Sequence, residues 1–325
     1  MAQDPIDAIS GGYRASQVLL TANRLGVFAA LGRNTMNADE IAKAVEADRR
    51  GTRILCDALV VLSLLEKEGE NYKNSPLALE YLTPDAPNPR SALLWHGARL
   101  YERWGKLYDT VKTGKPAPED TIDPQLRGDE RKFALAMADI GRASARETAE
   151  ILDLSAVKTL LDIGGGPGMY AIEFARHNPQ LHAVVFDNEK TLEVTQANIR
   201  KAGLTDRVSV LPGDIFKDEL TEEYDFIFIS NLIHSYSYKE NNDLISKCAH
   251  ALTPGGQICI KDFLLNSDRT NPPWSTLFAV NMLVNTDRGD CYTMDEVKEW
   301  CQHANLTCDA VINVAAHSRI LVARA

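Results

Sequence analysis

Apolar residues in the first third of the chain recur at helical spacing. Residues 1–33 carry an apolar face with few charges, which predicts a helical segment buried against a large surface. The pattern over 37–83 predicts a small helical unit with a wing. In that unit a capped helix begins after Asn37, a second helix covers about 49–65, and 67–72 forms a hairpin.

The middle of the chain alternates between proline-containing loops and helical patterns. Residues 83–92 contain three prolines and predict a hinge-like loop. An aromatic-bearing helix is expected over 93–113, and a polar stretch over 114–130 separates it from a further helix at about 131–152.

After residue 155 short apolar runs alternate with helical patterns. The predicted strands are 159–163, 183–186, 208–211, 226–229 and 258–260, and the predicted helices between them are 171–177, 192–202 and 242–252. Continuous apolar strands joined by helices indicate a parallel sheet covered on both faces. Thr293 and Glu296 form a capping box for a last helix through Ala304. Two final strands, 307–314 and 317–324, are close enough in sequence to pair as an antiparallel hairpin.

These elements predict an α/β protein with a Rossmann-like, doubly wound, mostly parallel sheet and a terminal antiparallel hairpin. A length of 325 residues suggests about two domains. We expect a helical, winged-helix-like domain over 1–92, a helical linker contributing to a substrate pocket over 93–152, and a ligand-binding domain over 153–325.

Composition narrows the classes of partner. The chain has 45 acidic and 35 basic residues, a net charge of −10, which disfavours binding to nucleic acid or anionic lipid. The winged-helix-like unit over 37–83 has nine acidic and six basic residues, a net charge of −3, so a DNA-binding regulator is a weak alternative.

The sequence also bears on location and metals. No apolar run approaches the ~18 residues of a membrane-spanning helix, and the first residues lack the pattern of a signal peptide, so we expect a cytoplasmic protein. The six cysteines show no metal-binding spacing. We therefore expect reduced thiols and no metal.

A glycine-rich loop after the first strand of the sheet is the most informative segment. Four glycines fall within five residues over 164–168, where the backbone can turn sharply and let a ligand approach closely. Gly166, Gly168 and Ala171, followed by Asp187, also satisfy the dinucleotide-binding pattern. The glycines alone therefore leave a nicotinamide dehydrogenase open.

Two further features favour another cofactor. Asp162 lies inside the end of the strand, where its carboxylate would repel a pyrophosphate but attract the amino group and sulfonium of S-adenosylmethionine. The third strand ends at Gly213, Asp214, Ile215 and Phe216, which offers a carboxylate and an apolar side chain to an adenine.

With these residues the chain resembles the class I S-adenosylmethionine-dependent methyltransferases of the caffeate/acetylserotonin O-methyltransferase type. The resemblance covers nearly the whole chain. Its motifs are the helical start, the winged-helix unit at 38–82, the loop from Asp162 to Gly168, Asp187, Gly213 to Phe216, and Asn231 to His234.

The resemblance implies S-adenosylmethionine as the cofactor and a role for each matching residue. Gly164, Gly166 and Gly168 would line its methionine part, and Asp187 would hold both ribose hydroxyls. Asp214, with Ile215 and Phe216, would bracket the adenine. Ser230 stands where plant members often have a basic residue near the cofactor. The N-terminal segment would form an intertwined homodimer.

His234 is the candidate general base for removing a hydroxyl proton from the acceptor. Asp262 aligns with a family acid that orients this base, whereas a second family acid falls at Cys291, beside Asp290. Members of the family typically continue after the histidine with Asp-Trp, where this chain has Ser235 and Tyr236. These departures leave open C- or N-methylation by proximity and a cofactor-binding homologue without turnover.

An aromatic-lined acceptor pocket would suit a small planar molecule. Ordinary helix packing is the competing interpretation for each lining residue. The residues that fall in pocket-lining regions of relatives include Trp104, Met137, Tyr236, Phe278, Met282 and Asn285.

Overall fold

The computed structural model describes residues 4–314 and 317–325, which form two compact units. One unit comprises the chain up to Tyr101 together with 124–127. The other comprises 102–123 and the chain from Gly128 onward. None of the helices described has both the length and the apolar character needed to cross a membrane.

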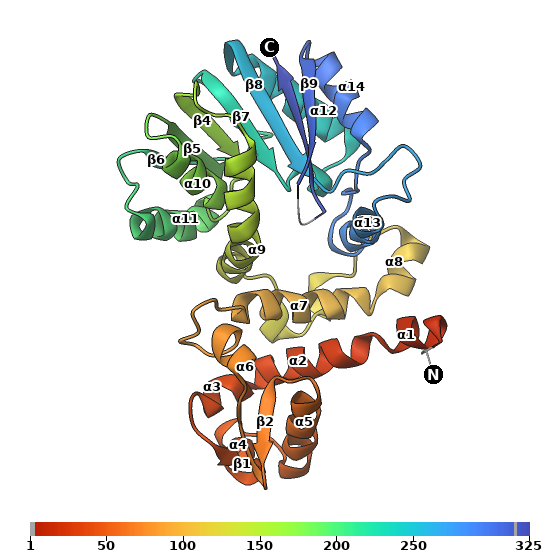
Figure 1. Cartoon of the computed structure of the whole chain (residues 1–325). Helices are drawn as coiled ribbons and strands as arrows, with labels where there is room; N and C mark the ends of the chain where they lie inside the picture. Colours follow the sequence, from red (N-terminus) through yellow and green to blue (C-terminus); the bar gives the residue numbers. More distant parts are fainter. Residues whose placement is uncertain (1–3, 315–316) are drawn as a thin grey trace. The chain divides into compact units, whose positions relative to one another are not determined.

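The first unit is the predicted helical unit with a wing (Figure 1). Its helices are α1 (Pro5–Gly11), α2 (Tyr13–Leu25), α3 (Val27–Leu31), α4 (Ala38–Ala44), α5 (Arg49–Val61) and α6 (Pro76–Tyr81). Its strands β1 (Met36–Asn37), β2 (Leu65–Glu68) and β3 (Asn71–Asn74) form an antiparallel sheet in the order β1-β3-β2. The predicted hairpin is therefore confirmed.

Two predicted boundaries in this unit are refined by the structure. The helical segment at 1–33 is divided where Gly26 ends α2 in a left-handed conformation (φ +79°). The helix predicted over 49–65 ends at Val61, because Ser63 adopts positive φ and Leu65 already pairs with Asn74 in the wing. Asn37 and Glu40 form the expected capping box of α4.

The segment between the wing and the large sheet consists of helices. These are α7 (Ser91–Trp104), α8 (Leu107–Thr113), the short 3₁₀ turns η1 (Glu119–Thr121) and η2 (Pro124–Leu126), and α9 (Glu130–Ile151). The prediction of a single helix over 93–113 is wrong, because α7 ends before Gly105 and α8 begins at Leu107. Glycine costs about 1 kcal/mol in a helix interior, so a break is favoured there.

The second unit contains a seven-stranded sheet in the order β6-β5-β4-β7-β8-β10-β9. Its strands are β4 (Thr159–Ile163), β5 (His182–Asp187), β6 (Val208–Pro212), β7 (Tyr224–Ser230), β8 (Leu252–Asp262), β9 (Thr307–Asn313) and β10 (Arg319–Arg324). All neighbours from β6 to β8 are parallel, and β10 pairs antiparallel with both β8 and β9. The predicted sheet and terminal hairpin are confirmed.

Helices cover both faces of this sheet, as Figure 1 shows. The helices that follow β4 in the chain are α10 (Met169–His177), α11 (Glu189–Ala202), α12 (Tyr238–His250), α13 (Pro273–Asn285) and α14 (Met294–His303), with the short 3₁₀ turn η3 (Ile233–Ser235) after β7. One buried cluster joins α9, α10 and α11 to the side chains of Leu160 and Phe228, and a second joins α12 and α14 to those of Leu161 and Ile227. Alternate residues of each strand therefore serve opposite cores.

Candidate active site

The glycine-rich loop follows β4 at the point where the strand order reverses. β4 lies between β5 and β7, and the chain returns from the β6 edge to build β7 on the other side. In open parallel sheets, ligands bind outside the carboxyl ends of the strands at such a switch point. The loop of residues 164–168 occupies this position.

Close packing under the loop explains why glycine is needed there. Gly164, Gly166 and Gly168 all have positive φ (62°, 55° and 77°). A Cβ on Gly165 would lie 2.6 Å from the carboxyl group of Asp162, and one on Gly168 would lie 2.8 Å from the Thr195 methyl group. Any larger residue at Gly165 or Gly168 would therefore collide with these neighbours, so only glycine fits.

Asp162, at the end of β4, places a buried carboxyl group against this loop. The residue is completely buried, and neither carboxylate oxygen has a hydrogen-bond partner in the described chain. Burial, with a contribution from nearby Asp187, raises the pKa of Asp162 to about 8. A buried carboxyl group of this kind fits a ligand that brings a positive charge.

Asp187 ends β5 and is fixed by backbone donors. Its Oδ2 accepts a hydrogen bond from the Gly166 N–H at 2.8 Å, and its Oδ1 accepts one from the Asn188 N–H at 2.7 Å. Burial raises the pKa of this carboxyl group. The bond to Gly166 ties the glycine loop to the residue expected to hold the ribose.

The turn after β6 contains the residues expected around the adenine. Ile215 is buried, while Phe216 is exposed and packs edge-on against the Tyr236 ring at 4.7 Å. The Asp214 carboxylate accepts hydrogen bonds from the Phe216 N–H at 3.0 Å and from Lys217 Nζ at 2.5 Å, and Lys217 lowers its pKa. At Gly213 a Cβ would lie 2.6 Å from the ring of Phe186.

His234 lies in η3, just beyond the end of β7, and is paired with Asp262 at the end of β8. His234 Nδ1 lies 2.7 Å from Asp262 Oδ1, and both residues are buried. Asp262 Oδ1 also accepts the Phe263 N–H at 2.8 Å, whereas its Oδ2 has no partner in the described chain. Phe278 of α13 packs edge-on against the imidazole at 5.0 Å.

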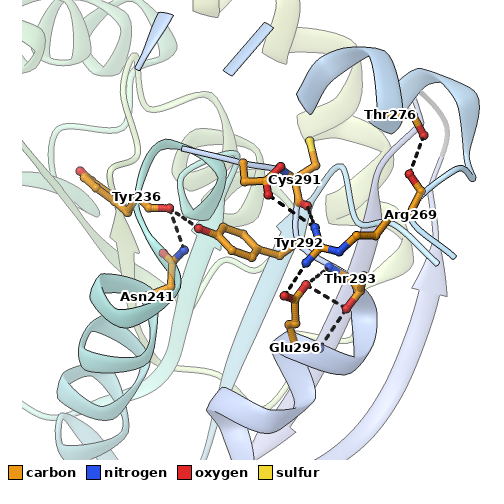
Figure 2. Close-up of polar contacts among 9 residues, drawn as sticks. Tyr236, Asn241, Arg269, Thr276, Cys291, Tyr292, Thr293 and Glu296 are labelled. Atoms are coloured by element: carbon orange, nitrogen blue, oxygen red, sulfur yellow. Dashed lines mark hydrogen bonds and ion pairs between the residues drawn. The ribbon is translucent and has the colours of Figure 1, made fainter. Parts of the chain in front are cut away.

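Two side chains hold the loop that carries His234. Tyr292 donates its hydroxyl to the Tyr236 carbonyl at 2.5 Å (Figure 2). Asn241 Nδ2 donates to the Ile233 carbonyl at 2.8 Å. These bonds bracket His234 on both sides in sequence. The candidate base His234 is therefore held by its backbone as well as by Asp262.

Arg269 organises the segment that would supply the second family acid (Figure 2). Its guanidinium donates to Glu296 at 2.6 Å, and to the Cys291 carbonyl and Asp290 at 3.4 Å each. The other Asp290 oxygen accepts the Cys291 N–H at 2.7 Å. Asp290 is thus engaged by Arg269 and its own backbone, and Cys291 is buried, with burial raising the pKa of its thiol.

The residues on the cofactor side fit S-adenosylmethionine. A cradle of glycines leaves the backbone accessible, and Asp162 places an unpartnered buried carboxylate beneath it. Ser230 Oγ and Asn231 Oδ1, at and just after the end of β7, are also buried without partners in the described residues. Buried polar atoms are nearly always satisfied, so these oxygens can accept hydrogen bonds from a ligand or from water.

Comparison with known proteins agrees with this geometry. Residues 121–305 match the O-methyltransferase domain model, and residues 8–84 match the O-methyltransferase dimerisation domain model. The chain is 30% identical over 301 residues to a 3-hydroxy-5-methyl-1-naphthoate 3-O-methyltransferase of Streptomyces sahachiroi, covering 91% of this chain and 87% of that protein.

The chain belongs to the O-methyltransferase family. It is also 30% identical to the acetylserotonin O-methyltransferase of Homo sapiens, with 86% of this chain and 85% of that protein covered. The crystal structure of human N-acetylserotonin methyltransferase in complex with S-adenosylmethionine superposes with a TM-score of 0.85 at 26% identity over 99% of this chain and 98% of that one. This chain is an S-adenosylmethionine-dependent O-methyltransferase.

Three of the six residues expected around the acceptor of this O-methyltransferase contact either His234 or Asn281. Phe278 contacts His234, and Tyr236 follows it in the same loop. Trp104 donates its indole N–H to Asn281 Oδ1 at 3.0 Å, and Asn285 Nδ2 donates to the same oxygen at 3.1 Å. Met282 lies between Phe278 and Asn285 in the sequence of α13. Met137 is half-buried on α9, and its described contacts do not join it to the other five.

Sequence reasoning missed several residues that hold the site. Thr195 donates to the Gly166 carbonyl at 2.5 Å and Asn198 to the Pro167 carbonyl at 2.9 Å, so α11 fixes the outer edge of the glycine loop. Asn241 and Tyr292 likewise bond backbone carbonyls of the loop that carries His234, and Arg269 bonds the Cys291 carbonyl. Each of these side chains bonds a backbone carbonyl in another segment, and no local pattern signals such a contact.

Proposed function

We propose that this O-methyltransferase uses His234 as the general base that removes the proton from a hydroxyl group of a small planar acceptor. The observation that carries the proposal is the buried pair of His234 and Asp262 at the carboxyl ends of β7 and β8, next to the glycine loop after β4. Methylation of a hydroxyl group requires a base close to the bound methyl donor, because the hydroxyl proton must be removed.

Asp262 determines which nitrogen of His234 is available. A carboxylate can only accept a hydrogen bond, so the proton lies on Nδ1 and the lone pair on Nε2. His234 Nε2 then accepts the hydroxyl proton, and Asp262 stabilises the imidazolium that results. S-adenosylmethionine supplies an electrophilic methyl group on a sulfonium. The remaining work of the protein is to align the acceptor oxygen with that methyl group.

The acceptor is a small aromatic molecule. The rings of Phe278 and Phe263 lie 4.4 Å apart and flank His234, and the Tyr236 ring lies against Phe216. Flat apolar walls of this kind favour a planar acceptor. Relatives named for a hydroxynaphthoate and for acetylserotonin support a fused-ring phenol as the first acceptor class to test.

We further propose a cytoplasmic homodimer. The match of residues 8–84 to a dimerisation domain supports the dimer, and Ile6, Ile9 and Tyr13 of the N-terminal helices are exposed apolar side chains. The net charge of −10 argues against nucleic acid as a partner. We propose three functional regions: 1–92 for dimerisation, 93–152 for the acceptor pocket and 153–325 for cofactor binding.

The test is transfer of a labelled methyl group from S-adenosylmethionine to a panel of fused-ring phenols. Each phenol is paired with the analogue in which the hydroxyl is replaced by hydrogen and with the corresponding amine. Label transfer that requires the hydroxyl supports the proposal. Equal transfer to the hydrogen analogue would indicate C-methylation, and transfer to the amine alone would indicate N-methylation. Cofactor binding without any transfer would indicate a non-catalytic homologue.

A further inference from the structure

Lys261 near the end of β8 is a buried cation without an acidic partner. It is 1% exposed, and among the described residues it forms no ion pair. Its Nζ donates one hydrogen bond, to Ser318 Oγ at 3.0 Å, and lies 5.5 Å from the centre of the Tyr170 ring. An ammonium group has three donors, and burying one against a hydroxyl and a ring leaves its charge uncompensated.

The sheet register places Lys261 on the same face as Asp162. Asp162 pairs with Phe228 of β7, which pairs with Cys259 of β8, and Lys261 is two residues beyond Cys259. Phe228, Cys259 and Tyr170 all belong to the buried cluster on the α10 side. Because side chains alternate between faces, Lys261 shares this side with Asp162, whereas Asp262 projects to the opposite side with His234.

Ser230 lies between the two charged residues. It pairs directly with Lys261 in the register of β7 and β8, and its Oγ is buried without a described partner. The carboxyl ends of β4, β7 and β8 thus present, on one face, a carboxyl group and a hydroxyl without partners among the described residues, and an ammonium whose partner there is the neutral Ser318 hydroxyl. An α-amino acid carries the complementary charges, an ammonium and a carboxylate on one carbon.

The spacing also fits an amino acid. β4 and β8 are two strands apart, so their backbones lie about 10 Å from each other across the sheet. When an amino-acid head group forms one hydrogen bond at its ammonium and one at its carboxylate, the two protein atoms that make these bonds lie about 8–9 Å apart. We propose that Lys261 binds the carboxylate of the methionine part of the cofactor while Asp162 binds its ammonium group, so that the two side chains grip the head group from opposite ends.

This inference rests on the proposed use of S-adenosylmethionine at this edge of the sheet. Plant members of the family often have a basic residue near the cofactor where this chain has Ser230. The inference assigns the corresponding positive charge to Lys261 on the neighbouring strand β8. The competing source of the same chemistry is a carboxylate on the acceptor. The two sources predict different responses to changes at Lys261.

The experiment measures binding by calorimetry, without turnover. The ligands are S-adenosylhomocysteine and its decarboxylated analogue, which keeps the amine and loses the carboxylate. Lys261→Met is expected to weaken S-adenosylhomocysteine binding about 10- to 100-fold, the effect of a lost charge-assisted hydrogen bond. It should change binding of the decarboxylated analogue by less than about threefold. Lys261→Arg, which keeps the charge, should retain most of the affinity.

Two matched variants complete the design. Asp162→Asn should weaken the binding of both ligands, because both keep the amine that Asp162 is proposed to bind. Ser318→Ala removes only the neutral partner of Lys261 and should leave both affinities within about threefold. If Lys261→Met does not fold, Lys261→Gln replaces it, because an amide can still donate to Ser318.

Three results would overturn the inference. They are unchanged S-adenosylhomocysteine affinity in Lys261→Met, an equal loss for both ligands, and an effect confined to KM for an acidic acceptor. Failure of the unaltered enzyme to bind S-adenosylhomocysteine would instead overturn the proposed function, and the inference with it.

Discussion

Two regions at the carboxyl edge of the sheet differ in how far the protein itself positions their polar groups. We call the region around Asp162 and Ser230 the cofactor side, and the region around His234 and Asp262 the base side. On the cofactor side, Asp162 and Ser230 have buried oxygens without described partners. On the base side, Asp262 Oδ2 also has no partner among the described residues, but Asp262 Oδ1 already bonds His234, and Asn241 and Tyr292 fix the loop around it. The cofactor side is therefore complete only with an ionic ligand, whereas the base side is assembled before any ligand arrives.

This difference separates binding from chemistry. Changes on the cofactor side should alter affinity for the cofactor, because the protein there lacks only a ligand. Changes on the base side should alter turnover, because the geometry there is set by the protein itself. Each prediction below tests one side of this comparison.

His234→Ala should have the largest effect. We expect kcat to fall by about 10²- to 10⁴-fold, because the group that accepts the hydroxyl proton is removed. The affinity for S-adenosylhomocysteine should remain nearly unchanged. Steady-state kinetics and calorimetry on the same preparation measure both quantities. Intact turnover would mean that alignment alone drives the reaction and that the base side has no catalytic role.

Asp187→Ala should reverse that pattern. We expect cofactor binding to weaken by about 10- to 100-fold, because the carboxylate expected to hold the ribose hydroxyls and its bond to the Gly166 N–H are both lost. At saturating cofactor, kcat should recover to within a few-fold of the original value. A fall in kcat that saturating cofactor does not restore would show that the two sides are not separable.

Much of the fold was predictable because it depends on local patterns. The strands from 159–163 to 258–260 are continuous apolar runs, and the capping box of Thr293 and Glu296 forms as expected. The break at Gly105 was missed, since a single glycine interrupts an aromatic pattern that otherwise continues. Helix α13 was not predicted as an element, although its apolar residues were placed near the acceptor.

The site was predictable only as far as motifs reach. Asp162, Asp187 and the glycines lie within one strand–loop–helix unit and its neighbour, so their spacing in sequence reports their position. Thr195, Tyr292 and Arg269 act on backbone groups of distant loops. Those contacts arise only when the sheet brings the loops together. Lys261 lies one residue beyond the strand predicted over 258–260, and its burial was visible only in the structure.

The pH dependence of cofactor binding tests the uncompensated charge on the cofactor side. The pKa of Asp162 is raised to about 8, so below that pH the carboxyl group holds a proton that it must release to accept an ammonium group. Affinity for S-adenosylhomocysteine should therefore rise by up to about tenfold per pH unit between about pH 6 and 8, with one proton released. Calorimetry in buffers of different ionisation enthalpy counts that proton. In Asp162→Asn this rise should disappear.

The stability of the free enzyme should move in the opposite direction over the same range. The folded state holds the Asp162 proton at pH values where the unfolded chain has lost it, so the free energy of unfolding falls as pH rises toward about 8. Thermal unfolding with and without S-adenosylhomocysteine measures this. A free enzyme whose Tm is no more sensitive to pH than that of Asp162→Asn would contradict the assignment.

Cys291→Ser should have the smallest effect. The resemblance aligns Cys291 with a second acid that orients the base, yet here the thiol is buried and uncharged, and neighbouring Asp290 is held by Arg269. His234 is already fixed by Asp262 and by the loop bonds of Asn241 and Tyr292. We therefore expect kcat to stay within about threefold, which corresponds to less than about 0.7 kcal/mol. Asp262→Asn is the matched control, and it should lower kcat by about 10²-fold or more because an amide no longer enforces the Nδ1 tautomer. Comparable losses in the two variants would mean that Cys291 shares the work of orientation and that the base side depends on more than one acid.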